Sequence, residues 1–151
     1  PFLSRVGLER LGATYGQYLL DDVLDNPPDA KLFVLAFVRD LSSEKRAKLD
    51  ALKSRKGVHV FEPKKGSDLW SGSIAVEAKK AGVHFYAPAG SAFVCAAEGY
   101  VVVQALKDGL ITLNFKSGPI IDILSGEKIS ETSTATIKFS KGETRIFKTQ
   151  M

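Results

Sequence analysis

The side chains in this 151-residue sequence that could most readily act as nucleophiles or metal ligands are a single cysteine and two histidines. Cys95 lies within Phe93-Val-Cys-Ala-Ala97, a run typical of a strand interior. We therefore expect an inert core cysteine, because cysteine is among the most frequently buried residues. A small hydrolase-like enzyme that uses Cys95 as its nucleophile is the alternative, and it requires an accessible thiol.

His59 and His84 follow Gly57-Val and Gly82-Val and so occupy equivalent places in two similar segments. If these segments form neighbouring parallel strands, the two rings could come together. Two ligands do not make a zinc site, however, and no third ligand follows at a suitable spacing. We expect packed or surface histidines and no metal.

Acidic side chains at the ends of two candidate strands suggest a phosphoacceptor site. Asp21 and Asp22 end one such run and Asp40 follows another. A receiver fold needs a helix and a strand between these points, and the Pro27-Pro28 loop leaves no room for them. We expect carboxylates that stabilise loops.

Trp70 lies in the loop Gly66-Ser-Asp-Leu-Trp-Ser-Gly72. An exposed tryptophan could stack on a sugar ring or anchor an interface, whereas a buried one would plug the edge of the core. We name Trp70, Phe61 and Tyr86 as candidates for interface contact or sugar stacking. The glycines lack the spacing of a phosphate-binding loop, so no cofactor is expected.

The net charge is +4 and the pI is about 9.2. Basic residues are scattered and interleaved with acidic ones, so we expect a solvated lysine face and no nucleic-acid partner. No apolar run approaches the ~20 residues that span a bilayer, and no leader follows Pro1, so we expect a soluble chain without a membrane partner. One cysteine excludes an internal disulfide and leaves cytoplasmic and exported locations open.

Helix and strand signals alternate in the first part of the chain. Two prolines at 27–28 form a loop, Ser42 or Ser43 offers an N-cap, and Gly57 ends the following helix. This order predicts a β-α-β unit with a parallel sheet. The expected elements are a helix over 2–11, an extended run over 15–20, strands over 32–38 and 58–61, and helices over about 44–56 and 73–80.

The second part reads as strand after strand, with turn signals such as Glu98-Gly99 and Asp108-Gly109 between them. We expect antiparallel strands over 92–97, 100–105, 110–115, 120–124, 134–139 and 144–148. The sequence thus predicts a reduced α/β domain at 1–90 and an antiparallel β domain at 91–151, α+β overall, which can pack as one unit.

Several segments of the sequence resemble a known family, the barrel-type β-galactosidases. Leu11–Leu24 and Pro28–Leu35 resemble the start of the trimerisation domain, which is flavodoxin-like and glutamine-amidotransferase-like, and the helix over 43–52 looks like the one that follows it. The closing β segments of such enzymes are similar to Ala81–Tyr86, Tyr100–Ala105, Asp122–Glu127 and Gly142–Phe147. The connection from Pro63 to Gly82 is shorter than that domain implies.

The resemblance implies a non-catalytic accessory or oligomerisation module of a β-galactosidase-like glycoside hydrolase. Its partners would be the catalytic barrel of the same protein and further copies of the chain. The family's acid sits in an Asn-Glu pair, but Asn26 and Asn114 are followed by Pro27 and Phe115, so no catalytic residue carries over. A carbohydrate-binding module that uses exposed aromatic side chains is the alternative.

Overall fold

The structure is a computed structural model that describes residues 7–36, 38–63 and 71–149. It is an α+β protein in which antiparallel sheets predominate. The elements are α2 (Leu20–Asp25), β1 (Leu32–Val34), α3 (Ser43–Ser54), β2 (His59–Phe61), α4 (Ser71–Lys80), β3 (Ala92–Ala97), β4 (Tyr100–Ala105), β5 (Gly109–Asn114), β6 (Ile120–Asp122), β7 (Lys128–Ser130), β8 (Thr134–Phe139) and β9 (Thr144–Thr149).

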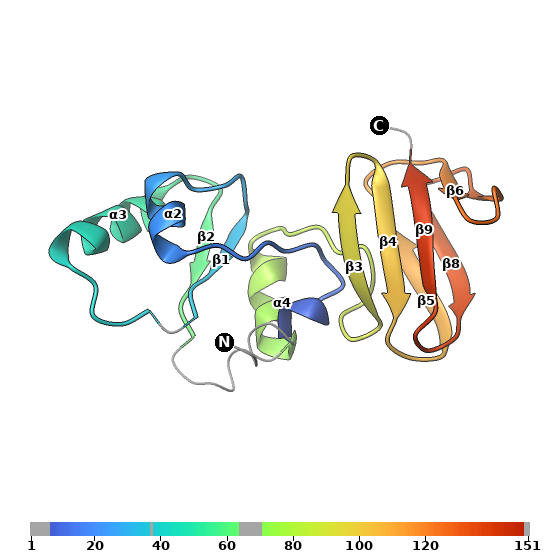
Figure 1. Cartoon of the computed structure of the whole chain (residues 1–151), viewed down its shortest axis with the longest axis horizontal. Coiled ribbons are helices and arrows are strands. Elements are labelled where there is room, and N and C mark those ends of the chain that lie inside the picture. Colours follow the sequence, from blue (N-terminus) through green and yellow to red (C-terminus); the bar gives the residue numbers. More distant parts are fainter. Residues whose placement is uncertain (1–6, 37, 64–70, 150–151) are drawn as a thin grey trace.

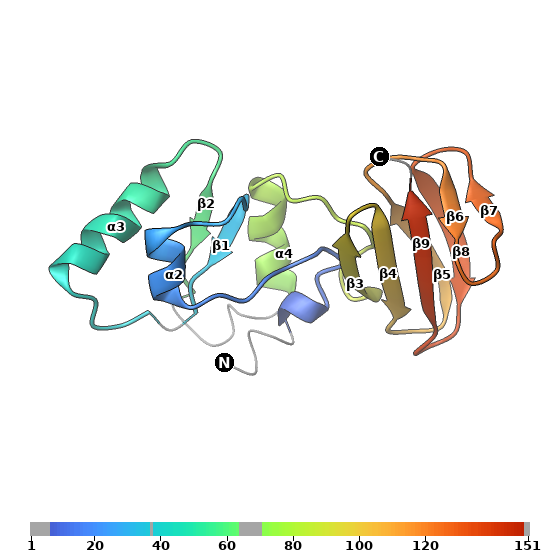
Figure 2. The same ribbon diagram turned by 45° about the horizontal axis from the view of Figure 1, so that its top comes forward.

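The first part of the chain is built around a short parallel sheet with helices on both faces. Strands β1 and β2 pair in parallel, with α3 between them in the sequence, as predicted. Leu32 and Val34 pack towards the α4 cluster, whereas Phe33 packs towards α2 and α3. Alternate side chains of a strand point to opposite faces, so a continuous apolar run marks a strand that is covered on both sides. Figures 1 and 2 show these layers, with α3 farthest from the remaining sheets.

Helix α3 begins and ends where the sequence provides signals. The Ser42 side chain accepts a hydrogen bond from the Lys45 backbone N–H at 3.3 Å, so Ser42 is the N-cap. Such a bond satisfies one of the amides that a helix leaves free in its first turn. Leu49 and Leu52 are buried against the sheet, and Gly57 has a φ of +80°, a conformation that favours glycine.

We expect Ser42→Ala to lower the free energy of unfolding by about 1 kcal/mol, because the capping bond is lost without any change in packing. Urea unfolding followed by circular dichroism measures this. Ser43→Ala, one residue further along, is the matched control and should change stability by less than about 0.5 kcal/mol. Equal effects of the two substitutions would contradict the assignment of the cap.

The second part is a β-sandwich. One sheet has the strand order β3-β4-β9-β6-β7, and β5 and β8 form a second, two-stranded antiparallel sheet. The residues between the sheets form one apolar cluster, in which Phe147, Leu113, Ile120 and Val103 are fully buried. Glu98 and Gly99 both have positive φ, as a tight hairpin turn between β3 and β4 requires.

The two parts meet where residues 10–12 hydrogen-bond to residues 86–90. The Gly12 carbonyl accepts from the backbone N–H groups of Tyr86 and Ala87 at 2.8 and 3.1 Å. A Cβ at Gly12 would lie 2.2 Å from the Ala87 oxygen, so the approach requires glycine there. Phe85 packs against the α4 cluster, whereas Tyr86 belongs to the sandwich core. The division into domains at residue 90 stays a prediction.

Three sequence-based expectations need correction. Residues 15–20 do not form a strand; Leu20 begins α2, so Asp21 and Asp22 lie in the first turn of a helix. The strand expected over 32–38 ends at Val34, because β2 offers partners only for residues 32–34. Strand β7 was not anticipated from the sequence. The helix expected over 2–11 extends beyond the described residues at its start.

Candidate functional site

The outward surface of the five-stranded sheet is apolar, and we call it the front face. Side-chain alternation and strand register define it: Cys95 lies opposite Val102, which lies opposite Ile146. Ile121 lies opposite Lys148 at the next strand. The front face consists of Phe93, Cys95, Ala97, Tyr100, Val102, Gln104, Ile121, Lys128, Thr144, Ile146 and Lys148.

The outward surface of β5 and β8, the back face, has the opposite character. Thr112 and Thr136 hydrogen-bond to each other at 2.9 Å, and the Thr134 hydroxyl donates to the Asn114 side chain at 3.3 Å. Leu110 is the apolar exception. Antiparallel sandwiches usually place polar residues outward, as the back face does. The front face departs from this rule, since most of its side chains are apolar and its polar ones are Gln104, Lys128, Thr144 and Lys148.

No described helix covers the front face. In Figure 1, β5 lies behind β4 and β9, and all the helices lie beyond β3. Tyr100 remains 43% exposed, with the Lys148 ammonium 5.9 Å from its ring centroid. Ile123, which directly follows β6 and donates its backbone N–H to Ile146, is 40% exposed. Large apolar side chains thus remain in contact with solvent on this surface.

Cys95 is exposed, which corrects the expectation of a core cysteine. It lies within a strand as predicted, but Val94, not Cys95, points into the sandwich. Its strand also borders a hollow of about 290 Å³, lined by Thr14, Tyr15, Gln17, Phe93, Val94, Cys95 and Ala96.

We expect the native 151-residue chain to react with one equivalent of the thiol reagent DTNB, because Cys95 is exposed at the sheet surface. The rate should lie within about tenfold of that of the urea-unfolded chain. Absorbance of the released thiolate measures both rates. A native rate that is lower by several orders of magnitude would place Cys95 back in the core.

The two histidines do not come together. The Nε2 of His59 lies 2.7 Å from Oε2 of Glu77 on α4, whereas that of His84 lies 2.8 Å from the Asn114 carbonyl oxygen. Lys80 and His59 hydrogen-bond to Glu77 and lower the pKa of this carboxyl. No described group of three His, Cys, Asp or Glu side chains could hold a metal ion.

Of the three acidic side chains named from the sequence, only Asp21 forms an ion pair within the described residues, and Asp25 forms a second one between α2 and α3. Lys45 lies 2.6 Å from Asp21, and Lys48 lies 2.8 Å from Asp25. The Lys48 hydrogen bond is the main cause that lowers the pKa of Asp25. Asp40 lies between β1 and α3, and its backbone φ is +50°. These contacts join two helices, so here the carboxylates stabilise packing.

The aromatic candidates occupy different environments. Trp70 lies outside the described residues. Phe61 is half-buried on β2 against the α4 cluster. Tyr86 is 6% exposed and stacks edge-on with His84 and Phe115, and burial raises its pKa. A role of any of them in an interface or in sugar stacking stays a prediction.

The exposed aromatic residues that sequence reasoning missed are Tyr18 and Tyr100. Tyr18 is 62% exposed and lines a second hollow of about 490 Å³ beside α2. A tyrosine directly before an acidic helix start and a proline loop was the available signal. The exposure of Tyr100 depends on which face of its strand is buried. The apolar residues around Tyr100 hide that face from a reading of the sequence.

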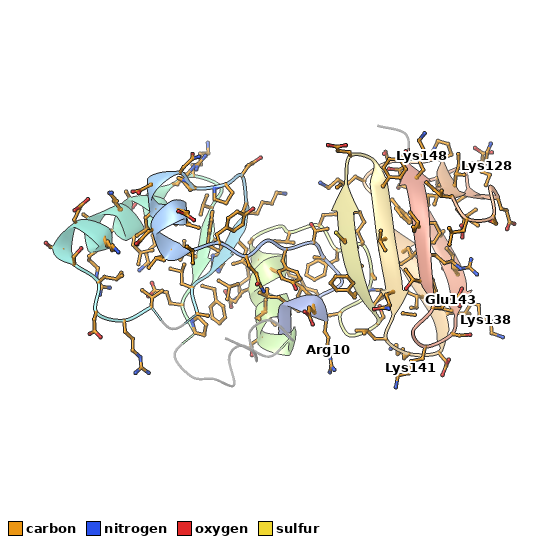
Figure 3. The ribbon with its side chains drawn as sticks, in the orientation of Figure 1. Arg10, Lys128, Lys138, Lys141, Glu143 and Lys148 are labelled. Carbon is orange, nitrogen blue, oxygen red and sulfur yellow. The ribbon has the colours of Figure 1, made fainter. Side chains whose placement is uncertain are left out.

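Basic side chains are distributed around the sandwich. Figure 3 shows Lys128 and Lys148 at one end and Lys138 and Lys141 at the other, with Glu143 among the latter pair. Glu143 accepts from the Ser140 backbone and from Arg145, which lowers its pKa. This is the interleaved pattern expected from the sequence, although nucleic-acid binding is untested. No helix in the described ranges is long and apolar enough to span a bilayer.

The solved structures to which this chain is similar include a β-galactosidase and an α-amylase. A β-galactosidase from Bacillus circulans sp. alkalophilus matches with a TM-score of 0.41 and 20% identity, over 60% of this chain and 14% of that one. An α-amylase from Malbranchea cinnamomea matches with a TM-score of 0.36 and 10% identity, over 97% of this chain and 44% of that one. The chain thus spans less than half of either enzyme. No family model and no curated protein sequence matches it.

Proposed function

We propose that these residues form a non-catalytic accessory module of a β-galactosidase-like glycoside hydrolase. The class of the parent protein is supported by the sequence segments that resemble β-galactosidases, among them Leu11–Leu24 and Asp122–Glu127. The observation that carries the role is the apolar front face. A surface of this kind marks a place where another structure packs.

The size of the front face favours packing within one polypeptide. Three strands about 20 Å long and two about 10 Å long, all about 4.8 Å apart, cover roughly 400 Å². Two such surfaces together amount to about 800 Å², within the 600–1,500 Å² typical of contacts between domains of one chain. A stable complex of separate proteins usually buries about 1,200–2,000 Å². The occupant that fits best is therefore a neighbouring domain of the same protein, the catalytic barrel.

The mechanism of such a module is structural. Burial of Val102, Ile146 and Tyr100 against the barrel would remove apolar surface from water, at about 25 cal/mol per Å². That contribution would hold the module in place and brace the wall of the neighbouring active site. Flavodoxin-like ancestry of the first part is included in this proposal and rests on the resemblance alone.

The direct test compares the 151-residue chain with the complete polypeptide that its gene encodes. A barrel with two strand-end glutamates should precede these residues. Labelling of Cys95 by DTNB should then be at least about tenfold slower in the complete polypeptide, because the front face is covered there. Equal labelling rates, or a gene that encodes no barrel, would refute the proposal.

Oligomerisation is the other role that the resemblance implies, and sedimentation velocity separates the two. The size of the front face predicts a monomeric 151-residue chain at micromolar concentration. A dimer in which Cys95 becomes protected would assign the front face to a second copy and overturn the packing on the barrel. A dimer in which Cys95 stays reactive would place self-association on another surface.

A further inference from the structure

The hollow beside α2, which extends from Tyr18 before the helix to the Pro27-Pro28 loop after it, has the chemistry of a sugar site. It measures about 490 Å³ and is lined by Tyr18, Asp22, Asp25, Asn26, Pro27 and Pro28. We propose that it binds one residue of a neutral oligosaccharide. Sugars present an apolar C–H face and a rim of hydroxyl groups, and binding sites that join an aromatic ring to a few polar groups satisfy both.

Tyr18 provides the apolar platform. Its side chain is 62% exposed, although an exposed aromatic ring of this size usually finds cover. The ring lies close against the backbone of Gly16: a Cβ added there would be 2.6 Å from Cε2 of Tyr18. Glycine at position 16 thus allows the ring to be supported from one side by the chain itself. The ring is positioned before any ligand arrives, which lowers the entropy cost of binding.

Asp22, Asp25 and Asn26 provide the polar rim. Asp25 is held by the Lys48 ammonium at 2.8 Å, which lowers its pKa and fixes it as an ionised acceptor. Asp22 forms no ion pair within the described part of the chain, so its oxygens face solvent. Carboxylates only accept hydrogen bonds, whereas the amide of Asn26 both donates and accepts. This set matches hydroxyl groups, which also do both.

The same charges argue against other ligands. Asp25 is paired with Lys48, but the Asp22 carboxylate, which has no ion pair within the described residues, repels an anionic sugar or a phosphate. A cation would need more than these two groups, and no described cluster of three acidic, His or Cys side chains could hold one. A metal ion held by these carboxylates would also leave the Tyr18 ring unused, since such ions take oxygen ligands. A neutral sugar, by contrast, can use the Tyr18 ring and the polar rim together.

The hollow lies far from the front face. Figures 1 and 2 show α2 beside α3, at the opposite end of the chain from β4 and β9. Packing of the sandwich on another domain would therefore leave the hollow open. The sugar site is independent of the proposed packing role, and a failure of either leaves the other standing.

The experiment is an NMR titration of the 151-residue chain with lactose, maltotriose and trigalacturonic acid as probes. At least one of the two neutral sugars should shift the amide signals of residues 16–26 saturably, with a Kd on the order of 1 mM. Trigalacturonic acid, which is anionic, should shift them weakly or not at all. Titrations repeated with EDTA should give the same result, because no cation is involved.

Tyr18→Ala should weaken binding at least about tenfold, since the platform is lost. Tyr100→Ala, which removes the other exposed tyrosine named above, is the matched control and should bind like the unmodified chain. Gly16→Ala keeps the tyrosine but displaces its ring, and should weaken binding as well. The proposal is overturned if neither neutral sugar saturates the signals below about 50 mM, or if Tyr18→Ala binds as the unmodified chain does.

Discussion

Replacement of Phe147 by alanine should lower the free energy of unfolding by about 3–5 kcal/mol. Phe147 lies in β9, the central strand of the five-stranded sheet, and its side chain is fully buried. Its ring centroid is 5.5 Å from that of Phe115 on the other side of the core. Truncation therefore removes buried apolar surface and leaves a cavity that neighbouring strands cannot close.

Urea unfolding of the two proteins measures this loss. A domain of this size has about 5–15 kcal/mol of stability in total, so the variant is expected to be marginal at 25 °C. Phe147→Leu, which keeps most of the volume, should remain folded and lose about 1.5 kcal/mol or less. Leu110→Ala, on a side chain that is 71% exposed, is the matched control and should stay within about 0.5 kcal/mol. Equal losses at positions 147 and 110 would contradict the described core.

Local signals predicted much of the fold. The strands over 92–97, 100–105 and 134–139 were predicted with the bounds that the structure has. Turn residues explain this success, because Glu98 and Gly99 adopt the positive φ that a hairpin demands. The same holds for α3, whose cap and terminal glycine both lie in the sequence. Such signals act within a few residues and need no knowledge of tertiary contacts.

Predictions failed where a distant partner decides the local structure. Leu20–Asp25 is a helix because Val23 is buried among Phe33, Leu49 and their neighbours, and because Asp21 pairs with Lys45. An acidic first turn is favourable for a helix, yet six residues are too few for a clear periodic pattern. The short α2 and the hollow beside it were therefore hidden from a reading of the sequence.

The misplacement of Cys95 has a different cause, and it bears on function. Strand sidedness is read from the alternation of polar and apolar residues. In Ala92–Ala97 and Tyr100–Val103 both sets of alternate positions are largely apolar, so the sequence does not distinguish core from surface. The property that concealed the exposure of Cys95 is thus the apolar front face itself. A surface with the apolar residue pattern of a core is one that a second domain is expected to cover.

Tyr100→Asp should uncover the front face in the complete polypeptide. It should leave the stability of the isolated chain nearly unchanged. In the isolated chain Tyr100 is 43% exposed, and Lys148 lies across from it, where it can neutralise an aspartate. Against another domain the same aspartate would be desolvated, which is costly for a charged group. DTNB labelling of Cys95 in the complete polypeptide should accelerate at least about tenfold, equivalent to a loss of 1.4 kcal/mol or more of packing energy.

Leu110→Asp is the matched control for this variant. It places the same charge at an exposed apolar position of the back face, which the proposal leaves in solvent, so the labelling rate should not change. Circular dichroism of both variants as isolated chains confirms that each remains folded. If Cys95 in the complete polypeptide stays protected after Tyr100→Asp, its cover does not depend on the front face. If both variants accelerate labelling equally, the effect is general destabilisation. Either result removes the packing role, because that role requires a loss of cover confined to one side of the sandwich.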